Sequence, residues 1–295
     1  MSNPQDQQNQ NETSSAELNK APYLVETDWL AAHLDDPQVR ILDMRFYFDR
    51  VGREAYLENH IPGAIHLDWS VELSDPANPV RFMVLPADQL VALMGKLGID
   101  NDTLIVAYDD EGGHYASRLW WALGYYGFDK VRMLHGGIQK WIAEGRPLTQ
   151  EIPTNIEPKA LFVASTPRPQ WRLTANEVLE RIGQPNSVLV DVRRPSEFVG
   201  EELRAARGGH IPGAVNLLWL ENLRPNLTFK DAESLRQRFE KAGVTPDKDV
   251  VTYCQGGVRA AHAMLTLKML GYPNVVLYDG SWEEWGNNPE LPLEK

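Results

Sequence analysis

The feature that most constrains the fold of this chain is an internal duplication. The segment HIPGAIHLDW at residues 60–69 returns as HIPGAVNLLW at residues 210–219. The stretches around it return in the same order, at a period of about 145 to 150 residues. A repeat of that length predicts two copies of a whole domain, and a chain of 295 residues has room for two domains of ordinary size.

Short apolar runs rich in β-branched residues alternate with helical stretches in both copies. The matching runs lie at residues 41–45 and 188–193, 104–108 and 250–253, and 131–134 and 275–278. The helical stretches lie at residues 87–96 and 116–125 in the first copy and 175–182 and 232–242 in the second. Strands that alternate with helices predict a parallel sheet. We therefore expect an α/β fold of two tandem domains, each a parallel β-sheet flanked by helices.

Composition divides the chain into four regions. Residues 1–21 are mostly polar and low in complexity, so we expect a disordered tail that buries no core. Residues 22–148 are expected to form the first domain and residues 171–295 the second. Residues 149–170, between them, contain four prolines and few helical signals, which predicts an extended linker.

Charge and cysteine content exclude several classes of protein. The net charge of -12 argues against nucleic-acid and membrane partners, because both present negative charge. One cysteine excludes an intramolecular disulfide. The first residues resemble neither a secretory signal nor a mitochondrial presequence, and no apolar run approaches the ~20 residues of a bilayer span. We expect a cytoplasmic protein without a cofactor and, since no Cys/His cluster is present, without a metal.

The single cysteine, Cys254, opens the segment with the clearest chemical pattern. An apolar run at residues 250–253 leads into CQGGVR at residues 254–259, and a helical stretch follows at residues 260–270. Glycines let backbone N–H groups turn inward, and the helix start adds positive dipole, so such a loop favours an anion and a thiolate. We interpret Cys254 as a nucleophile. The alternative is an inert core cysteine, which would normally lie inside a strand or helix.

The corresponding loop of the first copy has a different character. Tyr253-Cys254 aligns with Tyr108-Asp109, and the first loop reads DDEGG at residues 109–113. Three carboxylates cannot act as a soft nucleophile and would repel an anion. We therefore expect a catalytically silent first domain that serves as scaffold. The second domain is expected to carry the site at the carboxyl end of a parallel strand, facing the cleft between the domains.

This organisation resembles the tandem rhodanese-domain sulfurtransferases, which act on thiosulfate or 3-mercaptopyruvate. The resemblance covers nearly all of residues 22–295. It is carried by HIPGA in both copies, by the strand-end segment DVR at residues 191–193, by the Cys254 loop and by DGSW at residues 279–282. The resemblance implies that the first domain is silent and that Cys254 carries a persulfide.

The implied reaction has two displacements. Cys254 takes a sulfane sulfur from a small anionic donor, and cyanide or a thiol acceptor, such as a thioredoxin-like protein, then removes it, which predicts ping-pong kinetics. Backbone amides from Gln255 to Ala260 would hold the negative charge of the persulfide. Gln255, Gly256, Gly257, Val258 and Arg259 are therefore the expected substrate-binding residues of the loop. For Arg259, a surface position or a tie between the loop and a neighbouring acid is the alternative.

The choice of donor depends on arginines outside the loop. Animal-type members of the family have a donor-binding arginine where this chain has Glu197, just before Phe198. Arg193, Arg204 and Arg207 are the candidate replacements, or else solvated charges. Loss of an arginine weakens binding of a carboxylate-bearing donor most, because that pair is often bidentate. Thiosulfate is therefore the expected donor, with 3-mercaptopyruvate as the alternative.

Two other functions compete with sulfur transfer. Cysteine phosphatases and arsenate reductases need Cys-x5-Arg to wrap a tetrahedral oxyanion, whereas the arginine here is at the fifth position after Cys254, one residue short. A non-catalytic rhodanese binding module is the second rival, and such modules commonly lack the cysteine.

Two pairs of polar residues that both copies share are expected to be structural. His60 and His210 precede the Pro-Gly turns, and Asp43 and Asp191 end strands in a silent and an active domain alike.

Overall fold

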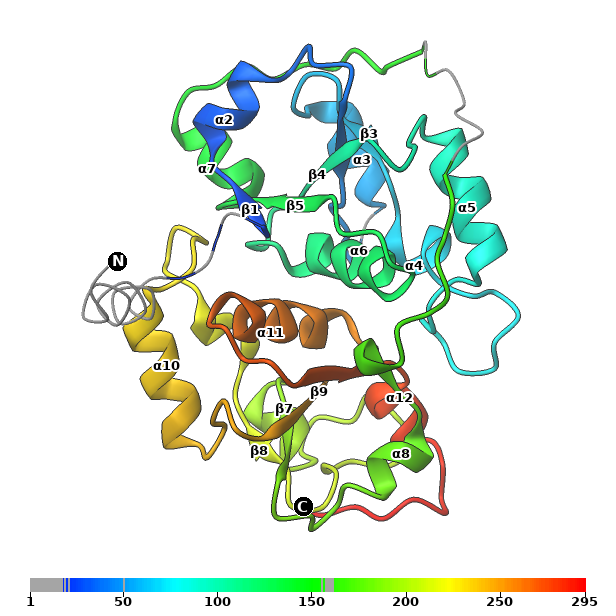
Figure 1. The fold of residues 1–295 in the computed structure, drawn as a ribbon, viewed down its shortest axis with the longest axis vertical. Coiled ribbons are helices and arrows are strands. Elements are labelled where there is room, and N and C mark those ends of the chain that lie inside the picture. Colours follow the sequence, from blue (N-terminus) through cyan, green and yellow to red (C-terminus); the bar gives the residue numbers. More distant parts are fainter. Residues whose placement is uncertain (1–17, 19, 21, 50, 155, 157–161) are drawn as a thin grey trace, which may run out of the picture.

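The computed structural model describes residues 18, 20, 22–49, 51–154, 156 and 162–295, and these form two α/β domains with the same plan (Figure 1). The tail predicted at residues 1–21 lies outside the described residues except for Leu18 and Lys20. Most of the described part of the predicted linker has no regular structure, and Thr149 makes an isolated bridge to His60.

The first domain contains a five-stranded sheet in which every strand pair is parallel. Its strands are β1 (Leu24–Val25), β2 (Val39–Asp43), β3 (Ile65–His66), β4 (Leu104–Tyr108) and β5 (Val131–Leu134). Their order across the sheet is β1-β5-β4-β2-β3. The central strand β4 is therefore the one that leads into the DDEGG loop.

The second sheet repeats this arrangement strand for strand. Its strands are β6 (Arg172–Leu173), β7 (Ser187–Asp191), β8 (Val215–Asn216), β9 (Asp249–Tyr253) and β10 (Val275–Tyr278). The order is β6-β10-β9-β7-β8, again parallel throughout, so the central strand β9 ends directly before Cys254. The parallel sheets and the duplication predicted from sequence are confirmed. The two-residue edge strands β1 and β6 were not predicted, because two residues are too few to show a pattern.

Helices connect the strands in the predicted places. In the first domain they are α2 (Thr27–Ala32), α3 (Gly52–Glu58), α4 (Trp69–Glu72), α5 (Ala87–Lys96), α6 (His114–Tyr125) and α7 (Gly137–Ala143). In the second they are η2 (Pro169–Trp171), α8 (Ala175–Leu179), α9 (Pro195–Phe198), η3 (Trp219–Asn222), α10 (Ala232–Lys241), α11 (Val258–Met269) and α12 (Ser281–Trp285). The prediction at residues 87–96 matches α5, and the other predicted helices differ from the observed ones by a few residues at their ends.

Alternate residues of the central strands face two separate cores. Along β4, Ile105 and Ala107 point into one cluster, while Val106 and Tyr108 point into another, as the period of two in a strand requires. Helices α2 and α7 cover the outer face of the first sheet, and α8 and α12 cover that of the second.

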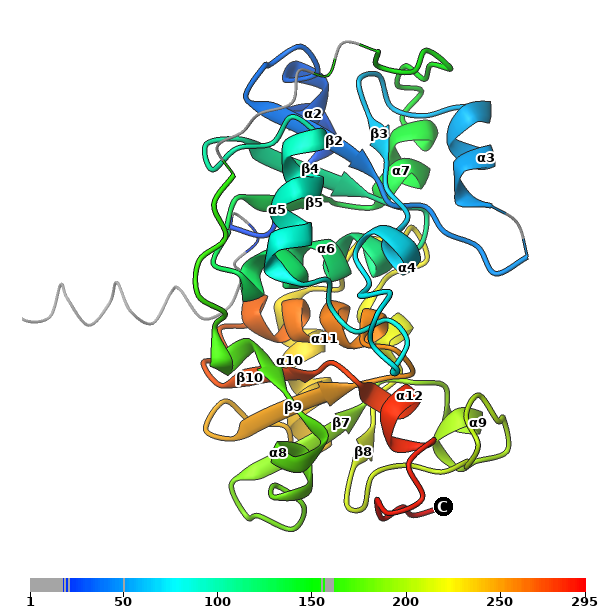
Figure 2. The same ribbon diagram turned by 90° about the vertical axis from the view of Figure 1, so that its right-hand side faces the viewer.

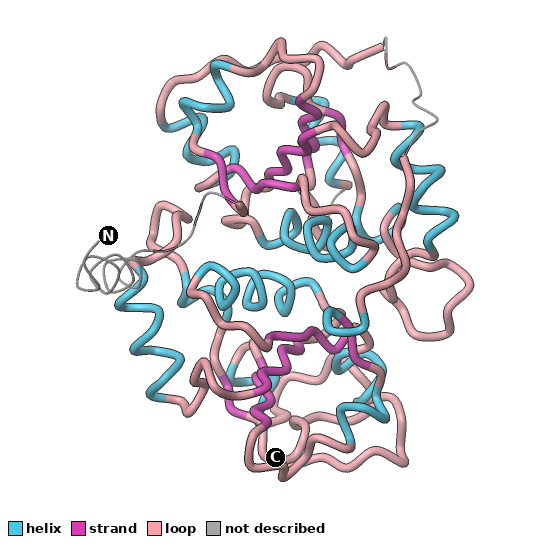
Figure 3. The backbone as a smooth tube through the Cα atoms, viewed as in Figure 1, coloured by secondary structure: helices cyan, strands magenta, loops and turns pink. Residues whose placement is uncertain are grey.

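The inner faces of the two sheets share one core, because α6 and α11 lie between them and pack against each other (Figures 1 and 2). Figure 3 shows both helices between the two sheets. Close contact extends to the helix ends, since a Cβ atom at Gly124 of α6 would lie 2.2 Å from the ring of Trp171. The two domains are therefore joined by a buried apolar interface rather than by a linker alone.

A buried carboxylate adds polar contacts across this interface. Asp279, at the end of β10, pairs with Arg118 of α6 at 2.8 Å, and both side chains are fully buried. Asp279 also accepts a hydrogen bond from the backbone N–H of Val84 at 3.0 Å and one from Arg172 at 3.1 Å. Removing one partner of a buried ion pair is costly, so these contacts fix the domains relative to each other. Within the described part of the chain, no helix has the length and hydropathy needed to cross a bilayer.

Candidate active site

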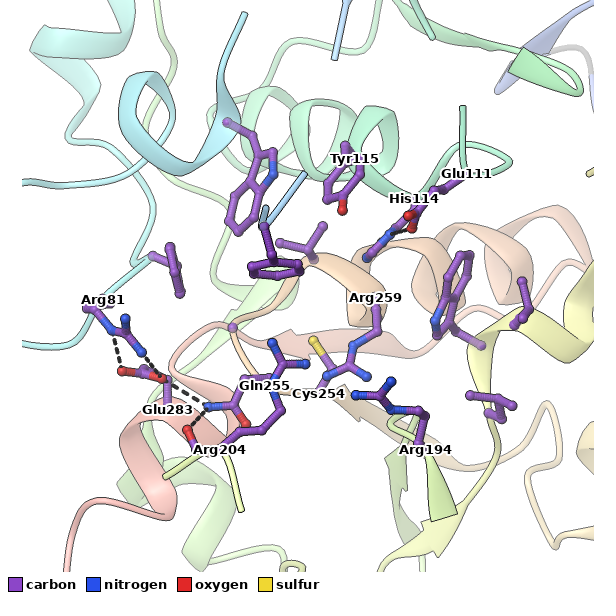
Figure 4. Close-up of a pocket in the computed structure, with 18 of the residues that line it drawn as sticks. Arg81, Glu111, His114, Tyr115, Arg194, Arg204, Cys254, Gln255, Arg259 and Glu283 are labelled. Atoms are coloured by element: carbon purple, nitrogen blue, oxygen red, sulfur yellow. Dashed lines mark hydrogen bonds and ion pairs between the residues drawn. The ribbon is translucent and has the colours of Figure 1, made fainter. Parts of the chain in front are cut away.

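Cys254 lies in a cavity of about 730 Å³ between the two domains (Figure 4). The loop contributes Gln255, Gly256, Val258 and Arg259 to the same cavity. The cavity is therefore built at the carboxyl end of β9, where open parallel sheets usually bind ligands.

The segment after β10 holds the cysteine loop in place. The Ser281 hydroxyl accepts a hydrogen bond from the Cys254 N–H at 3.1 Å. The N–H groups of Trp282 and Glu283 donate to the carbonyl oxygens of Cys254 and Gln255, at 2.9 and 2.8 Å. Ser281 has a φ of 48°, in a region that non-glycine residues rarely adopt. The DGSW segment thus positions Cys254, a role that the sequence analysis did not assign.

The amide groups around Cys254 are available to an anion. Gly257 has a φ of 78° and caps the start of α11, so the loop turns directly into the helix. Among the described residues, no protein acceptor is recorded for the N–H groups from Gln255 to Ala260. Unpaired N–H groups at a helix start favour negative charge, so a thiolate or persulfide at Cys254 would meet them.

The first-domain loop has the same frame but contains its own anion. The Asp109 carboxylate, which is fully buried, accepts hydrogen bonds from four backbone N–H groups. The donors are Glu111 at 2.9 Å, Gly113 at 2.8 Å, Tyr115 at 2.7 Å and Ala116 at 3.0 Å. Burial raises the pKa of Asp109 above its usual value, although these amides oppose the rise. In the first domain a carboxylate of the protein therefore already occupies the space that the loop amides enclose.

Arg259 makes the contact that we considered as its alternative role, a tie between the loop and a neighbouring acid. Its guanidinium makes two hydrogen bonds to Glu197, at 2.7 and 3.0 Å, and it also lines the cavity. Burial opposes the charge of Arg259, but the hydrogen bond to Glu197 and the charge of Cys254 raise its pKa. Burial raises the pKa of Glu197, yet the hydrogen bond and charge of Arg259 outweigh it and lower that pKa to about 2.

Glu197 also brings two other arginines to the cavity. Arg204 lies 3.6 Å from Glu197 and Arg194 lies 3.4 Å from it. Both line the cavity, and Arg204 lies over the ring of Phe48, 5.4 Å from its centroid. Glu197 therefore does not replace the positive charge of the expected arginine, but it holds the guanidinium groups of three other arginines near Cys254. The sequence analysis named Arg204 but missed Arg194, which directly follows the DVR segment.

Arg193 and Arg207, the other two candidates for donor binding, lie outside the cavity. Arg193 is only 1% exposed and makes a bidentate pair with Asp191, with Nη2 at 2.6 Å. Arg45 pairs with Asp43 in the same way in the first domain, in agreement with structural roles for both aspartates. Arg207 donates to carbonyl groups at the end of α12 and in the segment after it. Both arginines thus make structural hydrogen bonds, and neither is placed to contact the sulfur donor as we expected.

The first domain supplies an aromatic wall. Phe48, Trp69, Phe82 and Tyr115 line the cavity opposite the cysteine loop. A Cβ atom at Gly256 would lie 2.8 Å from the Phe82 ring, so the loop needs glycine there to accept the wall. These residues were not predicted, because their approach to Cys254 depends on how the domains pack.

Polar residues of both domains complete the rim. Arg81 makes a bidentate pair with Glu283, at 2.7 and 3.1 Å. Glu283 also accepts a hydrogen bond from Gln255 at 3.0 Å, which fixes that side chain. Gly257 does not line the cavity, but a Cβ atom there would lie 2.7 Å from Arg118. Across the described ranges, no group of three or more His, Cys, Asp and Glu residues is arranged to hold a metal ion.

Comparison with known proteins identifies similar chains over this whole architecture. The family model described as "Rhodanese-like domain" matches residues 26–144 and residues 174–288. The sulfur carrier protein TtuD of Thermus thermophilus is 41% identical over 286 residues, which cover 92% of this chain and 96% of that protein. The thiosulfate sulfurtransferase of Azotobacter vinelandii is 38% identical over 275 residues, with 92% and 97% covered.

A solved structure shows a similar relationship. The crystal structure of SseA from Escherichia coli, reported with the catalytic mechanism of 3-mercaptopyruvate sulfotransferases, superimposes with a TM-score of 0.79. It is 35% identical in sequence, and the match covers 88% of this chain and 98% of that one. The similarity thus includes both domains.

Proposed function

Because this chain belongs to the rhodanese-like domain family and is a sulfurtransferase, we propose that it takes the sulfane sulfur of thiosulfate on Cys254. The observation that carries the proposal is the position of Cys254, the chain's one thiol, among unpaired backbone amides in a cavity that four arginines line. A doubly charged donor would meet positive charge there despite the net negative charge of the protein.

The first displacement needs no proton. The Cys254 thiolate attacks the outer sulfur of thiosulfate, the sulfur–sulfur bond of the donor breaks, and its electron pair leaves with sulfite. The product is a persulfide whose outer sulfur carries the negative charge, and the amides from Gln255 to Ala260 are placed to stabilise that charge. In the second displacement an acceptor attacks the outer sulfur, and Cys254 leaves as a thiolate.

Thiosulfate suits the arginine arrangement better than 3-mercaptopyruvate. Arg259 already directs both arms of its guanidinium at Glu197, so it offers no free fork to a carboxylate. Relatives named thiosulfate sulfurtransferase, 36–38% identical to this chain, support the same choice.

A phosphatase mechanism is not favoured by the same contacts. The arginine of such an enzyme must grip two oxygens of the phosphate, whereas the fork of Arg259 is occupied by a carboxylate.

The acceptor is better matched by an organic thiol than by cyanide. A cavity of about 730 Å³ has the size of a small-molecule site, far larger than a two-atom anion needs. Its aromatic wall offers apolar contact to the body of a thiol. The similarity to a named sulfur carrier protein is consistent with sulfur that leaves for another thiol-bearing partner.

Intact-mass measurement tests the proposal. The protein is incubated with thiosulfate, and separately with 3-mercaptopyruvate, beside Cys254→Ser. We expect the mass of one added sulfur on the wild type alone, with faster loading from thiosulfate. Faster loading from 3-mercaptopyruvate would reverse the donor assignment. No added sulfur from either donor would contradict the persulfide.

A further inference from the structure

The first domain places a histidine–carboxylate pair in the active-site cavity. His114 is the first residue of α6, and its Nδ1 lies 2.8 Å from Glu111 Oε2. Both residues line the cavity that contains Cys254. Figure 4 shows His114 reaching from the start of α6 toward the cavity, on the side of Arg259.

The ring of His114 is held rigidly. It stacks on Tyr115 with 4.3 Å between centroids, and on Trp219 of the second domain with 4.5 Å. The residue is only 8% exposed. Its Nε2 is buried and has no hydrogen-bond partner among the described residues. Buried polar atoms without a partner are uncommon in proteins, and this one belongs to a residue that lines the cavity, so it has no protein partner that would keep it from taking up a proton.

The pair is not needed to hold its own loop. Asp109 already accepts four backbone hydrogen bonds and satisfies the turn into α6. The Glu111 carboxylate forms a hydrogen bond with His114. A carboxylate that accepts the Nδ1 proton of a histidine leaves Nε2 as the basic nitrogen. This geometry is that of an oriented base rather than of a loop brace.

The charges around His114 come from two elements. Asp109 and Glu111 face it from its own loop, His262 faces it from α11, and Arg259 of α11 acts on Glu111. Burial raises the pKa of Glu111, but the hydrogen bond and charge of His114, and the charge of Arg259, bring it below its usual value. Glu111 therefore stays ionised at neutral pH and keeps its orienting role.

We propose that His114 is the base that removes the proton of a thiol acceptor during discharge of the Cys254 persulfide, with Glu111 as its positioning residue. The inference rests on the proposed function and concerns its second displacement. The thiosulfate step involves no proton transfer, so it gives this pair no task. Attack by a thiol needs a base, because a thiol must lose its proton to become a good nucleophile.

The atoms and electrons of the step balance without a further reactant. His114 Nε2 takes the proton from the acceptor sulfur, and that sulfur attacks the outer sulfur of the persulfide. The bond between the two persulfide sulfurs breaks, and its electron pair stays on Cys254 as a thiolate. The transferred sulfur, now bound to the acceptor, receives the proton back from His114. The products are a neutral acceptor persulfide and the starting enzyme.

The test measures loading and discharge separately by rapid mixing. The full chain is loaded with thiosulfate, freed of donor, and mixed with dithiothreitol over a range of pH, for the wild type, His114→Gln and Glu111→Gln. We expect His114→Gln to slow discharge by about 10²-fold near neutral pH and Glu111→Gln by about 10-fold. The rates should approach that of the wild type as the pH passes the pKa of the thiol itself. Loading should stay within about twofold in each variant.

Two controls separate this role from a structural one. His33→Gln changes a histidine that stacks on Trp29 of α2, away from the cavity, and should discharge like the wild type. Cyanide anion, assayed at alkaline pH, carries no proton and should discharge His114→Gln at the wild-type rate. An unchanged thiol rate in His114→Gln, or an equal loss at every pH, would overturn the proposal. Failure of the wild type to load from thiosulfate would contradict the proposed donor and leave a discharge test from another sulfur donor to decide about His114.

Discussion

The loops that follow β4 and β9 have the same frame and opposite contents. In the first domain the Asp109 carboxylate occupies the space that the loop amides enclose, and four of them donate to it. In the second, the N–H groups from Gln255 to Ala260 have no protein acceptor in the described part of the chain. The loop of the first domain thus indicates which charge the loop of the second is shaped to receive. The two copies therefore differ in the source of the anion. In the first domain the protein supplies it, and in the second the reaction supplies it.

The bracing of the two loops differs in one residue. In the first domain Gly137, with a φ of 57°, precedes Ile138, whose N–H donates to the Asp109 carbonyl. In the second, Ser281 has a φ of 48° at the matching place. A glycine adopts this conformation without strain, whereas serine adopts it at a cost of about 1 kcal/mol or more. The second domain accepts that cost and gains the hydroxyl that holds the N–H of Cys254.

The comparison is tested most directly by replacing Cys254 with aspartate, the residue at the matching position of the first-domain loop. In Cys254→Asp we expect sulfur transfer to fall by about 10³-fold or more, because a carboxylate forms no persulfide. The measurement is the thiosulfate–cyanide rate together with intact mass after loading. Cys254→Ser should be as inactive, since it also lacks the thiol. A Cys254→Asp activity within tenfold of the wild type would show that another group carries the sulfur.

A second test concerns the acid that replaces the expected arginine. The folded pKa of Glu197 is about 2 and its ordinary value is 4.5, so its contribution to stability is complete above about pH 4.5 and is lost as pH falls toward 2. This predicts about 3 kcal/mol of pH-dependent unfolding free energy in that window, absent in Glu197→Gln. Urea unfolding at a series of pH values measures it. Parallel curves for both proteins would contradict the assignment.

Removing the anion of the silent loop should destabilise the protein without stopping the reaction. In Asp109→Asn the amide NH₂ group would face backbone N–H groups that now donate to a carboxylate, and we expect a loss of about 2 kcal/mol. Urea unfolding at neutral pH measures the loss, and persulfide loading per folded molecule should be nearly unchanged. The matched control is the neighbouring Asp110→Asn, since Asp110 accepts from Tyr47 instead. Equal stability of the two variants would remove the distinction between the loops.

The smallest predicted effect compares matching positions of α6 and α11. Arg118 and His262 both lie five residues after the capping glycine, but Arg118 pairs with Asp279 while His262 is stacked on Phe229. Burial and the charge of His114 lower the pKa of His262 to about 3. Below about pH 6.5 the unfolded state therefore binds a proton that the folded state does not, and stability falls.

Between neutral pH and about pH 5.5 this linkage amounts to about 1 kcal/mol. His262→Gln should lower stability overall but flatten that slope, whereas the wild-type slope should persist in His33→Gln. Thermal or urea unfolding across the pH range gives the slopes. A slope that His262→Gln leaves unaltered would assign the acid sensitivity to other groups.

The sequence was sufficient for the fold and for the centre of the site. The repeat and the alternating runs determine the sheets, and the glycine-bearing loop at a strand–helix junction identifies Cys254. Strands β1 and β6 and the aromatic wall were missed for different reasons. The strands are too short to show a pattern, and the wall depends on the packing of α6 against α11. The arginines show a third limit, because sequence cannot tell which of the neighbours Arg193 and Arg194 faces the cavity.

The lone thiol of the chain also determines how the protein meets oxidants. Cys254 is only 1% exposed and is the single cysteine of the sequence. A sulfenic acid formed there has no second cysteine in the chain with which to make a disulfide, and further oxidation is irreversible. Repair therefore depends on an external reductant that comes through the opening used by the sulfur acceptor. Access to the cavity therefore matters for repair of the protein as well as for sulfur transfer.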